Sequence, residues 1–444
     1  MKRTNQSERL TLLDKVNVCL QDFGDHVMHL VFDVSGSVDV SRLQRAARLS
    51  LIQHPIMSKR LVKHRWQPRW HDRSAQELDS YGYCELITSQ PRQSAIDEFL
   101  VKELDYQREP MLKIRVVRQQ HDTICIKVSC VPIDGRGFLI FVEDLLAIYE
   151  ALKHNPEYHP EPGSTALRST KALLPLFKLP DLFKLLFFGL KNQLTDSRTA
   201  GNWQFPCTDA THIEKRYYCH QFSESTLQAI TQYRKKAGLT FNDILLGAYY
   251  KALYDIIQPT RKGPFCILNT YDLRRYETES APDRVANYSS FINTNVSMDA
   301  KTDFIGAARG VHRSINDRKN HYPGMTEGPF IWPILTFLPF SVGSFIVKQL
   351  LKHRGEKIPV FTNVGVINTS SMLVEGRPIT NVMPFAPLEF PPKLTVTLAT
   401  SGQVVSLSVG YSAQHFPSAL MKRLFDEMER LILQTCSLPQ KEVA

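Results

Sequence analysis

The chain has 444 residues, more than the roughly 100–200 of one ordinary domain, so two comparable units or one large enzyme are expected. Hydrophobic residues make up 43% and charged residues 22%, without long acidic, Gln-rich or Ser-rich tracts, which excludes an extensively disordered chain. The net charge of +10 suits an acidic partner, but the basic residues are scattered outside any recognisable nucleic-acid module, so no nucleic acid partner is predicted.

The N-terminal residues 1–16 have a basic start but no uninterrupted apolar core followed by a small-residue cleavage site. We therefore predict no secretory signal and a cytoplasmic location. The 8 cysteines are dispersed without a CxxC pair, which disfavours both a zinc site and a disulfide framework. Most of them are expected to be buried thiols, and no metal site is predicted.

The first predicted elements are a strand and a helix. Apolar side chains stand at positions 28, 30, 32 and 34, the period-two pattern of a half-buried strand. After a turn at Gly36, either Asp39 or Ser41 caps a helix whose apolar residues recur every three or four positions. Pro55 ends this helix, because proline lacks the backbone donor that a helix interior needs.

Residues 111–134 are predicted to form two strands joined by a turn near His121 and Asp122. Alternate side chains of the second strand share one face. That face comprises Ile124, Ile126, Val128 and Cys130. The side chain of Ser129 is expected to face the other way.

Gly135 and Gly137 are predicted to form a tight turn that leads into a helix over 138–152. We attribute both glycines to close backbone approach, because no phosphate-binding GxxxxGK or GxGxxG context surrounds them. The polar, proline-rich segment 154–164 that follows is the best linker candidate.

The second half repeats this alternation of helices and strands. Helices are predicted behind Ser223 and, over 239–253, behind Thr240 or Asn242. Strands are predicted over 266–276, 287–296, 361–367, 394–400 and 404–412, and a terminal amphipathic helix over 418–435. We therefore predict an α/β fold with mixed sheets in two similar lobes. The expected division is a first lobe over 1–160, a linker with an apolar segment over 161–205 and a second lobe over 206–444.

Two apolar stretches break this pattern. Residues 173–194 suit an amphipathic helix with lysines on its wet side, and residues 328–347 are uncharged over about the length of a membrane span. Prolines at 329, 333 and 339 argue against a simple spanning helix, because each removes a backbone donor that lipid cannot replace. The alternatives are packing between the lobes, contact with a membrane surface or a lid over an apolar substrate, and a true span.

The ordered elements of the chain resemble a known superfamily. The strand followed by SGSVDVSRLQRAARLSLIQHPIMSKRL comes first, and SCVPIDGRGF then stands where the family has HHxxxDG. YDLRRY, NYSSFINTNV, FTNVGVI and a closing strand and helix follow. In this order and spacing they resemble the coenzyme A-dependent acyltransferases, which include condensation domains of nonribosomal peptide synthetases, alcohol acetyltransferases and chloramphenicol acetyltransferase.

This resemblance implies a pseudo-dimer of two chloramphenicol acetyltransferase-like lobes around a central tunnel. It implies transfer of an acyl group from acyl-coenzyme A or an acyl carrier protein to an amine or alcohol, with no bound metal or redox cofactor. The scattered positive charge suits such an acidic donor, and the two apolar stretches suit an apolar acceptor or acyl chain. Peripheral membrane contact is a further expectation.

The departure from the family falls on the reacting residue. The second His of the motif serves as general base or orients the acceptor, and Cys130 stands in its place, with Ser129 in place of the first His. A thiol at its reference pKa of about 8.5 is a poor base but a strong nucleophile once ionised. Cys130 therefore either carries the acyl group covalently, shapes the tunnel during direct transfer, or belongs to a scaffold that binds carrier proteins without transfer. A different condensation, such as carbon–carbon bond formation, is a further alternative.

Other site residues follow from the same resemblance. Asp134 and Gly135 keep the family pattern, and the family's Asp pairs with an Arg that matches Arg274, with Arg275 as the neighbouring alternative. We predict a structural ion pair, because an uncompensated buried carboxylate is costly. The predicted tunnel residues are Asn363, Gly365, Asn295 and Asn287. Candidate bases for the thiol are His212, His220, His312, His321 and His415.

Overall fold

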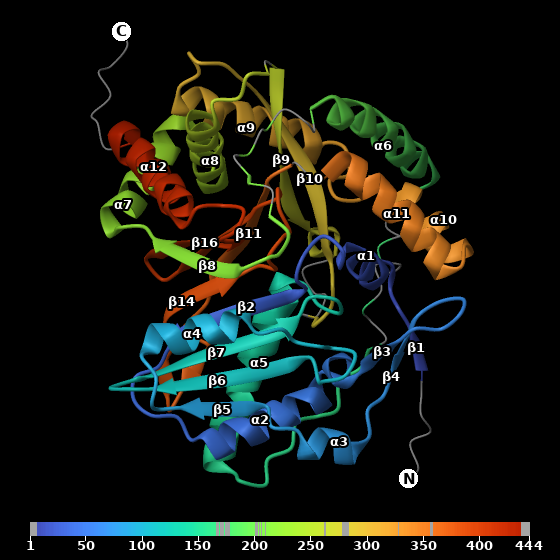
Figure 1. The fold of residues 1–444 in the computed structure, drawn as a ribbon, viewed down its shortest axis with the longest axis vertical. Coiled ribbons are helices and arrows are strands. Elements are labelled where there is room, and N and C mark those ends of the chain that lie inside the picture. Colours follow the sequence, from blue (N-terminus) through green and yellow to red (C-terminus); the bar gives the residue numbers. More distant parts are fainter. Residues whose placement is uncertain are drawn as a thin grey trace.

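The computed structural model describes residues 7–165, 168, 173, 178–199, 203, 205, 207, 208, 210–261, 263–277, 284–326, 328–355 and 358–436. Figure 1 shows two lobes stacked along the long axis, each with its own sheet. The predicted α/β class with mixed sheets is confirmed.

The first lobe has a five-stranded sheet in the order β14-β2-β7-β6-β5. Its strands are β2 (Val27–Asp33), β5 (Cys84–Ile87), β6 (Leu112–Arg118), β7 (Asp122–Ser129) and β14 (Thr380–Phe385). Helices α2 (Val40–Gln53) and α5 (Gly135–His154) bury their apolar sides with one face of the sheet, and α4 (Arg92–Val101) packs with the other. Every residue of β7 is buried, because helices or the second lobe cover both faces.

The second lobe has a six-stranded sheet in the order β10-β9-β11-β15-β16-β8. Its strands are β8 (Lys215–Gln221), β9 (Gly263–Asp272), β10 (Ser289–Met298), β11 (Val360–Ile367), β15 (Thr395–Ser401) and β16 (Val404–Ser412). Strand β11 runs parallel to both neighbours, and the other pairs are antiparallel. Its covering helices are α7 (Glu224–Ala237), α8 (Phe241–Ile257), α9 (Phe304–Lys319) and α12 (Ser418–Cys436).

Part of the C-terminal half of the chain belongs to the first lobe. Strand β14 comes from the C-terminal half but pairs antiparallel with β2 of the first sheet. The short hairpin β12 (Leu373–Val374) and β13 (Arg377–Pro378) also reaches back, and Glu375 at its turn accepts a hydrogen bond from Lys153 Nζ at 2.8 Å. The first lobe is thus completed by residues far along the chain, and a division at 160 and 205 stays a prediction.

Local capping determines where the helices start. The Asp39 carboxylate accepts a hydrogen bond from the amide of Arg42 at the start of α2, and the Thr240 hydroxyl accepts one from Asp243 at the start of α8. Ser223 caps α7 in the same way. Each side chain satisfies a backbone donor that has no partner inside the first helical turn.

A smaller group of elements closes the remaining side of the molecule. It comprises the three-stranded sheet β1 (Ser7–Arg9), β4 (Arg69–His71) and β3 (Arg60–Val62), with α3 (Ala75–Ser80) beside it, and the helices α1 (Leu12–Leu20), α6 (Leu179–Thr199), α10 (Gly328–Phe337) and α11 (Phe340–Gly355). Residues 328–347 therefore span two helices that meet at Pro339 rather than one. Across the described ranges, none of the helices combines the length and the apolarity needed to traverse a bilayer.

Candidate functional site

A large cavity lies between the two lobes. Its volume is about 1370 Å³, and its walls include the segment that follows β7, parts of β9, β10, β11 and β15, and the helices α1, α6, α10 and α11. Of the sequence-predicted residues, Cys130, Asp134, Gly135 and Asn287 line it. The residues around SCVPIDG and the second-lobe strands thus meet at one chamber.

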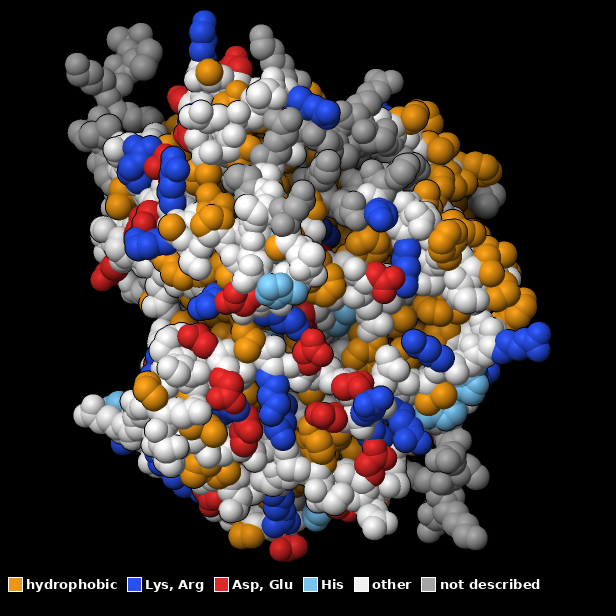
Figure 2. Space-filling view, in the orientation of Figure 1, with side chains coloured by type: hydrophobic (Ala, Val, Ile, Leu, Met, Phe, Trp, Pro, Cys, Tyr) orange, Lys and Arg blue, Asp and Glu red, His pale blue; other side chains and the backbone are white. Residues whose placement is uncertain are grey.

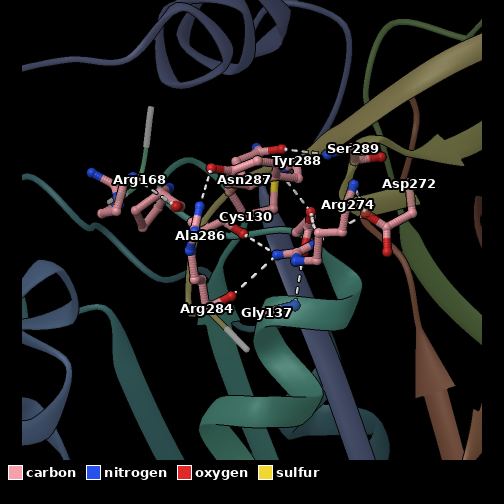
Figure 3. Close-up of polar contacts among 12 residues, drawn as sticks. Cys130, Gly137, Arg168, Asp272, Arg274, Arg284, Ala286, Asn287, Tyr288 and Ser289 are labelled. Carbon is pink, nitrogen blue, oxygen red and sulfur yellow. Dashed lines mark hydrogen bonds and ion pairs between the residues drawn. The ribbon is translucent and has the colours of Figure 1, made fainter. Parts of the chain in front are cut away.

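Cys130 stands one residue beyond the end of β7. Its amide donates a 2.8 Å hydrogen bond to the carbonyl of His26, which extends the pairing of β2 and β7 by one position beyond Val27 and Ser129. Its carbonyl lies 3.5 Å from the side-chain amide of Asn287, which comes from the second lobe (Figure 3). The backbone of Cys130 is therefore held from both lobes while its side chain lines the cavity.

The thiol of Cys130 has an imidazole beside it. Its Sγ lies 3.4 Å from Nδ1 of His26, and both side chains line the cavity. His26 was not among the bases considered from the sequence. The available signal was the register of the strands, since the residue before β2 faces the residue after β7 when the two strands pair antiparallel.

Four of the five histidines proposed as bases lie away from the cavity wall. Four have other surroundings: His220 faces Glu429 at 2.8 Å, His312 faces Asp243 at 2.8 Å, His415 faces Ser412 at 2.9 Å, and His212 is exposed. His321 lines the cavity just after the end of α9, with its Nδ1 2.6 Å from the carbonyl of Asp317 in the last turn of that helix. The base nearest the thiol comes instead from the first lobe.

Burial affects the two groups in opposite directions. It raises the pKa of the Cys130 thiol, and the carboxylates of Asp25 and Glu389 raise that pKa further. Burial lowers the pKa of His26, while Glu389 and Asp25 oppose that shift. At neutral pH the pair is therefore a thiol beside a neutral imidazole, with two carboxylates placed to stabilise an imidazolium if the proton moves.

Asp134 holds the start of α5 against the second lobe. Its carboxylate accepts bonds from the amides of Gly137 and Tyr288, both at 2.7 Å, and from Arg274 at 2.8 and 3.2 Å. Arg274 also contacts Asp272 at 3.1 Å and donates to the carbonyl of Ala286 at 3.0 Å (Figure 3). The carboxylate of Asp134 is thus engaged in capping α5 and in pairing with Arg274.

The two glycines of the motif differ in surroundings. A Cβ at Gly137 would lie 2.8 Å from the carbonyl oxygen of Ala286, so the second lobe approaches the backbone too closely for any side chain there. A Cβ at Gly135 would meet nothing within 4 Å. Close approach therefore explains Gly137, and the reason for glycine at position 135 is not visible in its packing.

The remaining predicted residues lie outside the cavity wall. The side chain of Ser129 is buried on the opposite face of the strand, where its hydroxyl accepts a bond from the amide of Val131 at 3.3 Å. Asn363 donates to Asn242 at 3.1 Å and accepts from the amide of Gly365 at 2.9 Å.

Strand alternation explains why the tunnel prediction for β11 was displaced by one residue. Thr362 and Val364 line the cavity, so Asn363 and Gly365 stand on the other side of the strand. The backbone amide of Asn295 donates a hydrogen bond to the hydroxyl of Ser314 on α9 at 2.9 Å. Asn295 lies beyond the stretch of β10 that lines the cavity. Of the four predicted tunnel residues, Asn287 alone belongs to the wall.

The described side chains include no group of three metal-ligating residues within reach of one ion. None of the eight cysteines forms a disulfide. Cys130, His26 and the carboxylates of Asp25 and Glu389 all line the cavity, so a thiol, an imidazole and two carboxylates are available there.

No protein-family model matches the sequence, and no curated protein sequence matches it significantly. Solved structures do match. One is the cyclization-docking bidomain of the nonribosomal peptide synthetase EpoB from Sorangium cellulosum, with a TM-score of 0.69 and 15% identity, covering 99% of this chain and 87% of that one. Another is trichothecene 15-O-acetyltransferase from Fusarium sporotrichioides, with a TM-score of 0.72 and 13% identity, covering 96% of this chain and 94% of that one.

A third is the first condensation domain of the calcium-dependent antibiotic synthetase in complex with a substrate analogue, with a TM-score of 0.70 and 12% identity over 99% of both chains. At these identities the matches establish architecture over the whole length. The chain therefore shares the fold of these cyclization and condensation domains and of the trichothecene acetyltransferase.

Proposed function

We propose that the protein is an acyltransferase that moves an acyl group from a coenzyme A or carrier-protein thioester to an amine or hydroxyl, through an acyl intermediate on Cys130. The observation that carries this proposal is the 3.4 Å contact between Sγ of Cys130 and Nδ1 of His26 at the wall of the cavity. A nucleophile within hydrogen-bond reach of a base is the arrangement that covalent acyl transfer requires.

In the first half-reaction, Sγ attacks the thioester carbonyl carbon while its proton passes to Nδ1 of His26. A sulfur–carbon bond forms, and the bond between the carbonyl carbon and the donor sulfur breaks. The departing pantetheine sulfur takes the proton back from His26 and leaves as a thiol. One thioester replaces another, so the step needs no oxidant or further reactant.

In the second half-reaction, the acceptor amine or hydroxyl attacks the acyl carbon of the Cys130 thioester. His26 takes the acceptor's proton and returns it to Sγ as the new amide or ester leaves. The carboxylates of Asp25 and Glu389 raise the pKa of His26, so they favour the imidazolium that forms in each half-reaction. Because burial holds the thiol protonated, His26 is needed at the moment of attack.

The partners proposed for this chemistry follow from charge and shape. The formal net charge of +10 suits an acidic donor such as coenzyme A or an acyl carrier protein. A chamber of about 1370 Å³ with leucine, isoleucine, phenylalanine and tryptophan side chains in its wall suits an apolar acceptor or a long acyl chain.

One observation favours a second function. Burial raises the pKa of Cys130 well above that of an exposed thiol, which is also the state of an inert packed cysteine. Under this alternative the protein binds a carrier protein or acyl chain without turning it over.

The experiment is intact-protein mass spectrometry after mixing with a panel of acyl-coenzyme A and acyl-carrier thioesters. The proposal predicts an acyl adduct that is lost in Cys130→Ala and kept in Cys125→Ala. Cys125 is the matched control because it lies on β7, the strand that leads to Cys130, is also buried and does not line the cavity. The adduct should disappear when a competent acceptor is added. An adduct-free wild type that yields no acylated product with any donor would favour the binding role instead.

A further inference from the structure

The helices α6, α10 and α11 carry an apolar surface that no described part of the protein covers. We name it the outer helical face. It comprises the exposed side chains of Leu182, Phe183, Leu186, Phe187, Leu190, Leu194, Trp332, Phe337, Val342, Phe345 and Leu350. Most of the exposed large apolar side chains in the described ranges belong to it, and Figure 2 shows hydrophobic atoms gathered on the flank of the molecule where these helices lie.

Helices α10 and α11 also have a buried inner face, so the outer helical face is a second apolar side of the same helices. On their inner sides, α10 and α11 bury Leu335 and Val347 against Cys19 of α1. The exposed side chains of Phe337 (64%) and Phe345 (63%) are on the opposite side. Helices that are apolar all round belong in a protein core or in contact with lipid, so the inner packing leaves the outer side unexplained.

Glycines bring the three helices together. A Cβ at Gly189 of α6 would lie 2.5 Å from the ring of Phe330 on α10, and a Cβ at Gly343 of α11 would lie 2.6 Å from the carbonyl oxygen of Ile334 on α10. Both α6 and α11 are thus in direct contact with α10. Their outward side chains therefore form one continuous surface rather than separate patches.

Most charged residues of α6, α10 and α11 are basic, although α6 also carries Asp181 in its first turn and Lys348 of α11 pairs with Asp22. Residues 328–355, which cover α10 and α11, contain no Asp or Glu, and their charged residues are all basic. On α6, exposed Lys184 and Lys191 lie two turns apart along one flank of the stripe formed by Phe183, Phe187, Leu190 and Leu194. Aromatic and aliphatic side chains bordered by lysines are typical of helices that lie in the interface of an anionic bilayer.

A tryptophan loop extends the surface. The carbonyl of Trp66 accepts a 2.7 Å hydrogen bond from the amide of Phe340, so the loop is tied to the start of α11. The Trp66 side chain is 57% exposed, and exposed Lys63 and Arg65 accompany it. Tryptophan prefers the headgroup region of membranes, and nearby basic side chains bind anionic lipid phosphates.

The cavity opens at this surface. Trp66, Leu182, Trp332 and Leu350 are exposed and also line the cavity, so they mark its mouth. A mouth rimmed by the outer helical face would exchange apolar molecules with a lipid layer without exposing them to water.

From these observations we propose that the outer helical face and the Trp66 loop dock the protein on an anionic lipid bilayer, with the mouth of the cavity toward the lipid. The inference concerns binding alone and is independent of the proposed acyl transfer. The three helices lie along the bilayer surface, with their apolar side chains among the headgroups and upper acyl chains.

The test is co-sedimentation of the full chain with vesicles of phosphatidylcholine mixed with phosphatidylglycerol, and with vesicles of phosphatidylcholine alone. The proposal predicts binding to the mixed vesicles that weakens at high salt, because salt screens the basic side chains. The triple variant Phe183→Ser, Phe187→Ser, Phe345→Ser should lower the affinity by at least about tenfold, since each change removes apolar burial. Lys184→Gln with Lys191→Gln should lower affinity for the mixed vesicles by about tenfold and leave weak neutral binding unchanged.

The matched control is Leu86→Ser with Val366→Ser. These side chains are 40% and 71% exposed, comparable with those of the outer helical face, but they lie on the sheet strands β5 and β11. This double variant should bind vesicles like the wild type. Because every substituted side chain is exposed, circular dichroism and thermal unfolding should match the wild type for all variants.

Several outcomes would overturn the proposal. They are no binding to either kind of vesicle, equal binding to neutral and anionic vesicles, and binding that the triple variant retains. A dimer in lipid-free solution that the triple variant converts to a monomer would assign this surface to a second copy of the chain.

Discussion

The Sγ atom of Cys130 and the Nδ1 atom of His26 lie 3.4 Å apart although 104 positions separate the two residues in the chain. They meet because β2 and β7 pair antiparallel and the hydrogen bond from the Cys130 amide to the His26 carbonyl continues that pairing. Two rigid strands therefore hold the thiol and the imidazole in position before any substrate arrives.

Replacing the imidazole of His26 tests whether this residue acts as the base for acylation of Cys130. In His26→Asn, the rate of Cys130 acylation at neutral pH should fall by about 10²- to 10⁴-fold, the usual contribution of general acid–base catalysis. Intact-protein mass spectrometry of samples quenched at successive times measures that rate. The control His121→Asn alters an exposed histidine in the turn between β6 and β7 and should acylate at the wild-type rate. Unchanged acylation in His26→Asn would show that the contact has no part in the chemistry.

The pH dependence distinguishes a base-assisted thiol from a free thiolate. Burial lowers the pKa of His26 from its ordinary 6.5, and the reactive form is the neutral imidazole. The acylation rate should therefore rise with pH through a pKa below 6.5 and then remain flat through pH 8. A free thiolate would behave differently, because burial raises the pKa of Cys130 above its ordinary 9.0. In that case the rate would climb about tenfold per pH unit across the same range, and such a profile would exclude His26 as the base.

The ion pair between the lobes should matter for stability more than for chemistry. Arg274 contacts Asp134 at 2.8 Å with both side chains largely buried, so Arg274→Ala leaves a buried carboxylate without its cation. Loss of one partner from such a pair costs about 3–5 kcal/mol. Arg275→Ala is the matched control, because Arg275 is exposed and lies over the ring of Tyr271. Urea unfolding of both variants measures the difference, and equal free energies of unfolding would contradict the structural role of the pair.

The sequence predicted the fold class because its signals are local. Alternation before Asp33, the cap at Asp39 and the cap at Thr240 depend on residues a few positions apart, and the structure has strand and helix starts where these patterns indicate them. Strand β14 could not be anticipated, because six residues that include Pro384 carry no mark of the sheet they join. Tertiary packing therefore decides that β14 joins the sheet of the first lobe.

At the site, sequence patterns identified segments better than side chains. Residues of SCVPIDG line the cavity, but which face of β11 lines that cavity depends on the placement of the sheet, so Asn363 was predicted where Thr362 lines the chamber. His26 was missed for a related reason, since its contact with Cys130 follows from strand register and not from any motif.

The two glycines of the motif make a sharp test of how closely the lobes approach. Gly137→Ala would place a methyl group 2.8 Å from the carbonyl oxygen of Ala286, next to Asp134, so the lobes must separate or α5 must shift. We expect a loss of about 1–3 kcal/mol in the free energy of unfolding, as for other overpacked sites. Gly135→Ala meets open space two residues earlier, and should be neutral or stabilising by up to about 1 kcal/mol, because alanine loses less backbone entropy on folding. Urea unfolding of both variants decides the matter. A larger loss in Gly135→Ala than in Gly137→Ala would mean that the contact with Ala286 is not the one that joins the lobes at this turn.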